Sequence, residues 1–189
     1  MRKGKKVLCL ALAVVLAAAL LTACQPAAEE KTRLDAIKEA GVLVVGTSPD
    51  YPPYEFIIAG EDGSMETVGI DMWIAADIAK ALGVELKIEA MDFAGLDSAL
   101  QMGTIDMIMA AYNPTEDRAE IMDFSEVYYI DTVVALTLAE NADQYTDLAS
   151  FSGQKVGVQL GTTLETDYFT QLEGAEKVAL KKITQLVPE

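Results

Sequence analysis

The sequence predicts an α/β fold built on a largely parallel sheet. Short apolar runs alternate with helix-like segments along most of the chain, and this order is typical of strand–helix–strand units. The run at 42–46 is continuously apolar, as is typical of a strand buried on both faces of a parallel sheet. Several helix-like segments end at a glycine, which is a common helix terminator.

Apolar spacing and punctuating residues separate the elements of the first half. Ile70, Trp73 and Ile78 fall on one face of a helix, which Gly83 ends. Two adjacent prolines exclude a strand at 51–54. The predicted elements are a helix at 34–40, a strand at 42–46, a loop at 51–54, a turn at 61–64, a helix at 69–82 and a strand at 84–88.

In the second half, Thr115 precedes two acids and predicts a helix N-cap. The passage at 133–145 is interpreted as a connection between a first lobe at 33–134 and a partial second lobe at 135–189. The predicted elements are a helix at 96–102, a strand at 105–109, a short helix after 115, a strand at 133–138, a helical turn at 147–148, a strand at 155–160, a helix at 162–172, a strand at 178–180 and the start of an element at 183–187.

The N-terminus predicts a secretory signal peptide at 1–23. A basic start at 2–6 precedes a short apolar run at 7–21 and a small-residue ending. A membrane anchor helix is the alternative, but the run is shorter than the about 20 residues that span a bilayer comfortably. The residues Leu-Thr-Ala-Cys before position 25 resemble a lipoprotein lipobox. This resemblance implies cleavage before Cys24, acylation of Cys24 with lipid such as palmitate, and a lipidated tether at 24–32 that anchors the protein stably to the membrane.

The charge and composition exclude several function classes. The chain has 14 Lys and Arg against 30 Asp and Glu, and four of the basic residues lie in the signal. This balance argues against binding nucleic acid, and against binding anionic lipid by charge. The absence of histidine excludes Ser-His-Asp catalysis and the usual zinc sites, and no EF-hand spacing is present. We therefore expect no metal, no cofactor and, with Cys24 as the one mature cysteine, no internal disulfide.

A series of motifs follows in order along the chain. The motifs are Val-Val-Gly-Thr at 44–47, Tyr-Pro-Pro-Tyr-Glu-Phe at 51–56, Val-Gly-Ile-Asp at 68–71, Met-Asp-Phe-Ala-Gly-Leu at 91–96, the segment 106–118, Met-Asp-Phe-Ser at 122–125 with the tyrosine pair at 128–129, and Val-Gly-Val-Gln-Leu-Gly-Thr-Thr at 156–163. In this order they resemble the family 3 solute-binding proteins, the polar amino-acid receptors of ABC importers. The resemblance implies a two-lobe, periplasmic-binding-protein-like type II fold that closes by a hinge around its ligand. It implies an extracytoplasmic, periplasmic receptor role in which a monomer passes an amino acid or similar zwitterion to an ABC transporter permease.

The resemblance assigns Arg118 to the ligand carboxylate, because a guanidinium offers a bidentate fork. The alternative is a surface arginine paired with a neighbouring acid, Glu116 or Asp117. Thr163 matches a second carboxylate contact. A helix N-terminus favours an anion, so backbone N–H groups of Gly161 and Thr162 are expected to contribute.

The remaining site residues are expected to hold the ammonium and the side chain of the ligand. For the ammonium, the match points to the carbonyl of Ala111 and to Asn113, where relatives carry Ser or Thr. For the side chain, it points to Tyr51 and Phe93 with Tyr54 nearby. The alternative for Tyr54 and Phe93 is a purely structural place in the core.

Ser48 matches a position that carries an acid in several relatives that bind basic or amide side chains. Serine there weakens the case for Lys, Arg or His as ligand, unless the loop turns Asp50 inward.

Relatives continue beyond the point where this sequence stops, so the sequence is expected to be a fragment or the product of a truncated gene. The second lobe is then expected to be poorly stable alone, because an unfinished sheet leaves an open edge.

Two other functions stay open at this point. One is an extracytoplasmic enzyme on the same fold, such as a cyclohexadienyl dehydratase, because fold does not fix function. The candidates for a catalytic acid or base near the expected cleft are Asp50, Glu55 and Asp92, and no two of them form a convincing acid–base pair. The other is a ligand-sensing module that signals rather than transports.

Overall fold

The structure, a computed structural model, describes residues 31–187 of the 189-residue chain. The predicted signal peptide and Cys24 lie outside the described residues. Within 31–187, no helix combines the length and the apolar character that crossing a membrane requires. The chain also forms α2 (Arg33–Ala40) before β1 (Val42–Thr47), and the 3-10 segments η2 (Ala139–Gln144) and η3 (Leu148–Phe151) before β7 (Lys155–Gln159).

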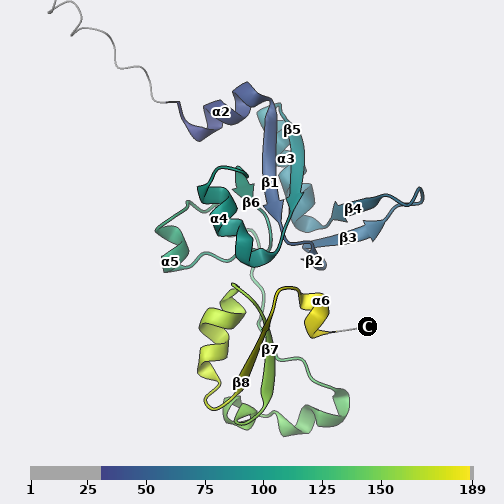
Figure 1. Ribbon diagram of the computed structural model, residues 1–189, viewed down its shortest axis with the longest axis vertical. Helices are drawn as coiled ribbons and strands as arrows, with labels where there is room; N and C mark the ends of the chain where they lie inside the picture. Colours follow the sequence, from purple (N-terminus) through teal and green to yellow (C-terminus); the bar gives the residue numbers. More distant parts are fainter. Residues whose placement is uncertain (1–30, 188–189) are drawn as a thin grey trace, which may run out of the picture. The chain divides into compact units, whose positions relative to one another are not determined.

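A three-stranded parallel sheet organises the first lobe (Figure 1). Its central strand β1 (Val42–Thr47) pairs in parallel with β5 (Glu85–Ala90) on one side and with β6 (Met107–Ile108) on the other. The predicted parallel sheet is therefore confirmed, with β6 shorter than the strand expected at 105–109.

Each face of this sheet is covered by a helix. Leu43 and Val45 of β1 share a core cluster with the buried side chains of α3 (Ile70–Leu82). Val44, which points to the opposite face, packs against the cluster that includes α4 (Leu96–Gln101). Burial on both faces explains why the run that forms β1 is continuously apolar.

The N-terminus of α3 fixes the loop that carries two predicted site residues. The N–H of Ile70 donates to the carbonyl of Pro53 at 3.1 Å, and the N–H of Asp71 donates to that of Tyr54 at 3.0 Å. Gly69 has a φ of 131°, and a Cβ there would lie 2.1 Å from the Tyr54 carbonyl oxygen. Only glycine lets the loop and the helix approach so closely.

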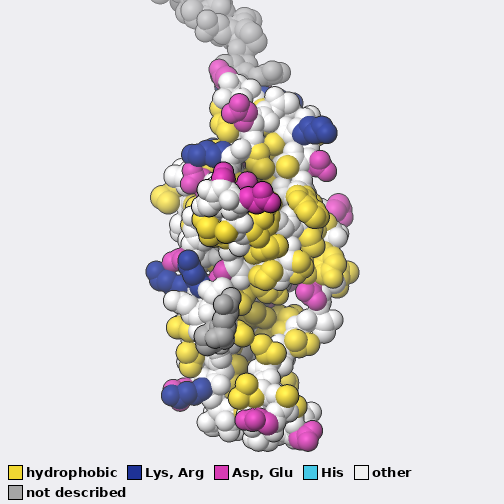
Figure 2. Space-filling model, turned by 90° about the vertical axis from the view of Figure 1, so that its right-hand side faces the viewer, with side chains coloured by type: hydrophobic (Ala, Val, Ile, Leu, Met, Phe, Trp, Pro, Cys, Tyr) yellow, Lys and Arg dark blue, Asp and Glu magenta, His cyan; other side chains and the backbone are white. Residues whose placement is uncertain are grey.

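A second sheet of the first lobe is antiparallel, with the order β2-β3-β4. Its strands are β2 (Asp50–Tyr51), β3 (Glu55–Ala59) and β4 (Met65–Val68). In Figure 2, which shows the side on which β3 and β4 lie in Figure 1, hydrophobic side chains gather on the surface.

The second lobe, as far as the structure describes it, is built on the parallel pair β7 (Lys155–Gln159) and β8 (Glu176–Leu180). The helix predicted at 162–172 is instead a π-helical segment, η4 (Leu164–Tyr168), followed by the 3-10 turn η5 (Phe169–Gln171). The short helix α6 (Ile183–Leu186) follows β8.

The prediction of a strand at 133–138 is wrong. This segment has no strand structure, and Val134 and Leu136 are 78% and 77% exposed. Its apolar, β-branched composition suits a strand, but a strand needs a neighbour for its backbone hydrogen bonds. Among the described residues no strand pairs with it.

Candidate functional site

The structure brings all nine residues predicted to bind the ligand to the wall of one cavity, which has a volume of about 430 Å³. This size suits a small molecule. Ser48 follows β1, Ala111 follows β6 and Thr162 follows β7, so the carboxyl ends of three parallel strands meet at the cavity. The nine residues are Ser48, Tyr51, Tyr54, Phe93, Ala111, Asn113, Arg118, Thr162 and Thr163.

Arg118 is placed by a capped helix turn. The hydroxyl of Thr115 accepts a hydrogen bond from the Arg118 N–H at 3.2 Å and so caps α5 (Glu116–Ala119), as predicted. The guanidinium then donates from Nη1 to the carbonyl of Asn113 at 2.7 Å and from Nη2 to the carbonyl of Gly161 at 3.0 Å. One guanidinium thus joins backbone groups of both lobes.

Arg118 is buried and lies over aromatic rings. Its side chain is 9% exposed, and its Cζ atom lies 3.9 Å from the ring centre of Tyr112, which stacks on Phe93. No carboxylate in the described part of the chain forms an ion pair with it. The alternative of a surface arginine paired with Glu116 or Asp117 is therefore wrong. A buried cation without a counter-charge is unfavourable, and an anion in the cavity would neutralise it.

Asn113 and Thr163 meet at the cavity from the two lobes. The Nδ2 atom of Asn113 donates to the hydroxyl of Thr163 at 3.3 Å. The side-chain oxygen of Asn113 can still accept a hydrogen bond, which is the property expected of a group that receives an ammonium.

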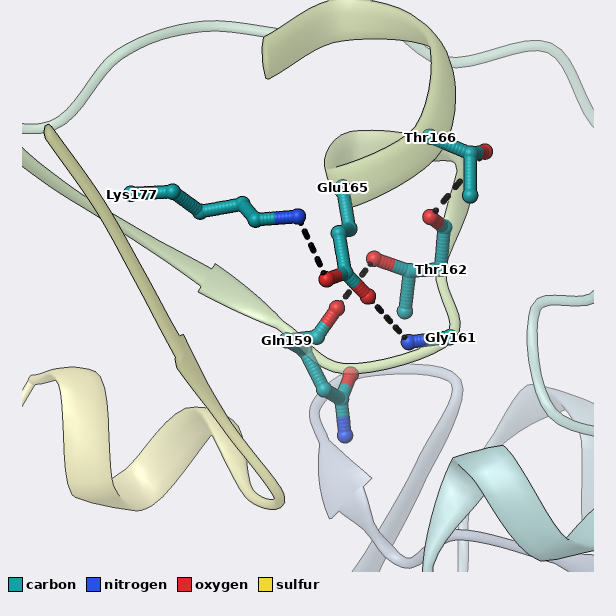
Figure 3. A network of polar contacts seen from close by, with 6 residues as sticks. All are labelled: Gln159, Gly161, Thr162, Glu165, Thr166 and Lys177. Atoms are coloured by element: carbon teal, nitrogen blue, oxygen red, sulfur yellow. Dashed lines mark hydrogen bonds and ion pairs between the residues drawn. The ribbon is translucent and has the colours of Figure 1, made fainter. Parts of the chain in front are cut away.

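The turn after β7 differs from the expected anion site (Figure 3). The N–H of Gly161 donates to Oε2 of Glu165 at 2.8 Å, and Lys177 holds the other oxygen at 2.9 Å. The hydrogen bonds from Lys177 and Gly161 keep the pKa of Glu165 below its usual value. The hydroxyl of Thr162 donates to the carbonyl of Gln159 at 2.7 Å. The chain's own carboxylate therefore occupies the Gly161 N–H that was expected to face a ligand.

The backbone at Ala111 is strained and held in place. Its φ is 47°, a left-handed conformation that residues other than glycine seldom adopt. Its N–H donates to Oδ2 of Asp71 at 2.7 Å, and Asp71 is fully buried at the start of α3. The carbonyl predicted to receive the ammonium thus belongs to a residue whose conformation a neighbouring carboxylate fixes.

Tyr54 and Phe93 both line the cavity and belong to the core. They are 7% and 8% exposed, and Phe93 opens the 3-10 turn η1 (Phe93–Gly95). Tyr51 and Tyr54 stack with ring centres 5.4 Å apart. The Tyr54 hydroxyl donates to Asp131 at 2.9 Å, and burial together with this hydrogen bond raises the pKa of Tyr54. The structural and the ligand-facing interpretations of these two rings are therefore compatible.

Asp50 lies at the cavity, because the loop does turn inward. Its carboxylate accepts hydrogen bonds from the hydroxyl of Ser48 at 3.2 Å and from the N–H of Ile183 at 2.8 Å. The amide of Gln159 approaches it at 3.4 Å. Asp50 therefore places a carboxylate next to Ser48, although the side chain at position 48 is itself not an acid.

The cavity is also lined by residues that were not predicted to bind the ligand, among them Tyr112, Tyr128, Asp131 and Gln159. Tyr112 lies between two predicted site residues, so its position in the motif was a usable signal. Tyr128 and Gln159 also lie in motifs of the family resemblance, whereas nothing in the local pattern around Asp131 marks a side chain that faces a ligand. No group of His, Cys, Asp or Glu side chains within 31–187 could hold a metal ion.

Comparison with known proteins adds to this geometry. The family model described as bacterial extracellular solute-binding proteins, family 3, matches residues 43–185. The arginine-binding extracellular protein ArtP of Bacillus subtilis is 35% identical over 123 residues, which are 65% of this chain and 46% of ArtP. A probable histidine-binding protein of Campylobacter jejuni is 37% identical over 148 residues, which are 77% of this chain and 54% of that protein. The chain thus spans about half the length of these curated relatives.

Two solved structures resemble the fold. An amino acid ABC transporter substrate-binding protein from Streptococcus pneumoniae, bound to L-arginine, superposes with a TM-score of 0.78 at 37% identity, covering 83% of this chain and 65% of that chain. The ancestral amino acid-binding protein AncCDT-1, a precursor of cyclohexadienyl dehydratase, gives a TM-score of 0.74 at 31% identity, covering 82% of this chain and 67% of that chain.

Proposed function

Because the chain belongs to the bacterial extracellular solute-binding proteins of family 3 and has their type II periplasmic-binding-protein fold, we propose that it captures a free amino acid between its lobes for an ABC importer. Relatives named for binding arginine, histidine and cystine support this class of ligand. In this proposal the protein works outside the cytoplasm, held to the membrane by a lipid on Cys24, and meets a permease as a monomer.

The observation that carries the proposal is the buried guanidinium of Arg118 at the cavity, without an ion-pair partner among residues 31–187. A ligand carboxylate is planar and accepts two parallel N–H bonds, so it matches the fork better than two separate carbonyls do. The rings of Tyr112 and Phe93 hold the guanidinium plane, which reduces the entropy lost when the carboxylate binds.

The other end of the ligand meets acceptors and rings. The Ala111 carbonyl and the Asn113 side-chain oxygen receive the ammonium, while Tyr51 and Phe93 line the space for the side chain. Asp50 lines the same cavity, so the serine at position 48 does not by itself disfavour a basic ligand.

A thermal-shift screen of residues 25–189 against the amino acids tests this function. A ligand at 100 times its dissociation constant adds about 2.7 kcal/mol to the free energy of unfolding. We expect a shift with one or a few amino acids, and its loss in Arg118→Gln. Arg33→Gln, at an exposed arginine of α2, is the matched control and keeps the shift. A cooperative melt that no amino acid shifts would contradict the proposal.

One observation favours an enzymatic alternative. Burial, with Asp71 and Asp50 nearby, raises the pKa of Glu55 to about 9, so this cavity residue holds a proton at neutral pH, as a general acid must. One similar structure, AncCDT-1, is an amino acid-binding protein and a precursor of cyclohexadienyl dehydratase. Incubation with prephenate or arogenate separates the two functions: product formation, abolished in Glu55→Gln, would favour the enzyme, and we expect none.

A further inference from the structure

Two buried carboxyl groups lie directly behind the strained residue of the candidate site. Glu55, the first residue of β3, is 1% exposed, and Asp71 near the start of α3 is 0% exposed. Their side chains are close enough to share a hydrogen bond. No cation forms an ion pair with either of them in the described part of the chain.

The surroundings of this pair favour a proton on one of its members. Asp71 accepts on both oxygens, from the hydroxyl of Tyr128 at 2.8 Å and from the N–H of Ala111 at 2.7 Å. An amide N–H can only donate, so that oxygen of Asp71 is an acceptor. Oε2 of Glu55 is buried and has no hydrogen-bond partner among the residues that the structure describes. Without a proton, the carboxylates of Glu55 and Asp71 repel each other. With a proton on Glu55, Glu55 can donate a hydrogen bond and Asp71 can accept it.

We propose that Glu55 is a positioning residue of the ligand site, which carries a proton at neutral pH and thereby holds Asp71 in the place where it fixes the Ala111 backbone. Asp71 also accepts a hydrogen bond from Tyr128, so the same carboxylate ties the site to the segment after α5 that leads toward the connection between the lobes. The role of Ala111 rests on the amino-acid receptor proposed above, whereas the proton on Glu55 does not.

The groups that face Glu55 come from three parts of the fold. Asp71 lies on α3, Asp50 and Tyr51 on β2, and Tyr128 in the segment after α5. None of them is a cation, so each either repels a charge on Glu55 or leaves it unaffected. Burial, and then Asp71 and Asp50, raise the pKa of Glu55 to about 9 from an ordinary value of 4.5.

The direction of the pH dependence follows from this. Between pH 4.5 and about 9 the folded chain holds a proton on Glu55 that the unfolded chain has lost, so this group's contribution to stability declines as the pH rises through that window. Above about 9 Glu55 ionises within the fold and repels Asp71. The contact between Asp71 and Ala111 then weakens.

Nuclear magnetic resonance on the ligand-free protein tests the proton directly. The amide proton of Ala111 and the side-chain carboxyl carbon of Glu55 are followed from neutral pH to well above 9. We expect both to titrate with a midpoint near 9, and the Ala111 signal to stay flat in Glu55→Gln, which mimics the neutral acid. Glu66→Gln, at an exposed glutamate of β4, is the matched control and titrates like the parent.

A Glu55 carbon that titrates near 4.5, or an Ala111 signal that titrates equally in Glu55→Gln, would overturn the proposal. If Glu55→Gln does not fold, the pH titration of the Glu55 carboxyl carbon in the parent protein still shows whether Glu55 carries a proton at neutral pH.

Ligand affinity tests the positioning. The ammonium of an amino acid titrates in the same range, but that change is common to all variants and cancels in a ratio. Relative to Glu55→Gln, the parent should lose affinity by about tenfold per pH unit above 9, as linkage to one proton requires. If the Ala111 signal titrates but the ratio of ligand affinities between the parent and Glu55→Gln stays constant with pH, the positioning role is refuted. Absence of amino-acid binding at every pH would refute the proposed function while the resonance titration still decides on the proton.

Discussion

Tyr112 and Arg118 show what a single contact contributes to the candidate site. The Tyr112 ring supports the guanidinium from one side, while its hydroxyl hydrogen-bonds to Asp97. Neither contact is visible from the sequence. Tyr112 and Arg118 are six positions apart and share no helix face, and Tyr112 and Asp97 are 15 positions apart. Arg118 itself was predictable, since it matches a family motif and stands among few cations in an acidic chain.

Replacing Tyr112 with leucine should weaken ligand binding while leaving the fold intact. A cation–ring contact is worth about 0.5 to 2 kcal/mol, so we expect the dissociation constant to rise by about 2- to 30-fold. Isothermal titration calorimetry measures this. Tyr112→Phe keeps the ring but loses the hydrogen bond to Asp97, and should bind nearly as the parent does. Equal losses in both variants would show that the hydroxyl, and not the ring, matters.

At the scale of elements, the junction between the loop at 51–54 and α3 positions the aromatic wall. The helix and its end were predictable from apolar spacing and Gly83, and α3 confirms both. The predicted apolar face was wrong at Trp73, which is 72% exposed, whereas Met72 and Ala75 are buried. The π-helical η4 was not predictable, because its five residues carry no local signal distinct from an α-helix. This turn lets Glu165 accept the hydrogen bond from the Gly161 N–H. For this reason the Gly161 N–H does not face a ligand, although the sequence had suggested that it would.

Gly69→Ala should destabilise the protein because of the contact at this junction. The new Cβ would lie 2.1 Å from the Tyr54 carbonyl oxygen, at a φ of 131°. We expect a loss of more than about 2 kcal/mol in the free energy of unfolding, measured by urea denaturation. Gly63→Ala is the matched control, since its φ of 81° is also positive but its Cβ would meet nothing within 4 Å. It should lose only about 1 to 2 kcal/mol. Equal losses would mean that backbone conformation alone accounts for Gly69.

At the scale of the whole molecule, local patterns predicted the α/β class and the parallel sheet, because burial on both faces leaves a continuous apolar run at β1. They failed at 133–138, where apolar composition indicated a strand but no partner strand is present among the described residues. Pairing is a property of two segments, and one segment's composition does not report it. The poor stability of the second lobe alone stays a prediction.

The cavity also belongs to the whole molecule, because its wall combines residues that lie more than 100 positions apart. Asp50 and Gln159, which are 109 positions apart, meet across the two lobes. Arg118 and Gly161, which are 43 positions apart, do the same. Family resemblance pointed to nine residues that line the cavity, and their role in ligand binding stays a prediction. The buried pair behind Ala111 became visible only once β3 and α3 were placed together.

The most direct measurement of the central claim, that Arg118 receives a ligand carboxylate, compares two ligands by calorimetry. One is the amino acid that gives the largest thermal shift, and the other is the amine that remains when its carboxylate is removed. We predict that the amino acid binds, that the amine binds at least 100-fold more weakly, as loss of a buried charge-assisted pair of hydrogen bonds implies, and that Arg118→Gln no longer distinguishes them. Equal binding of the amine, or unchanged amino-acid affinity in Arg118→Gln, would contradict the claim.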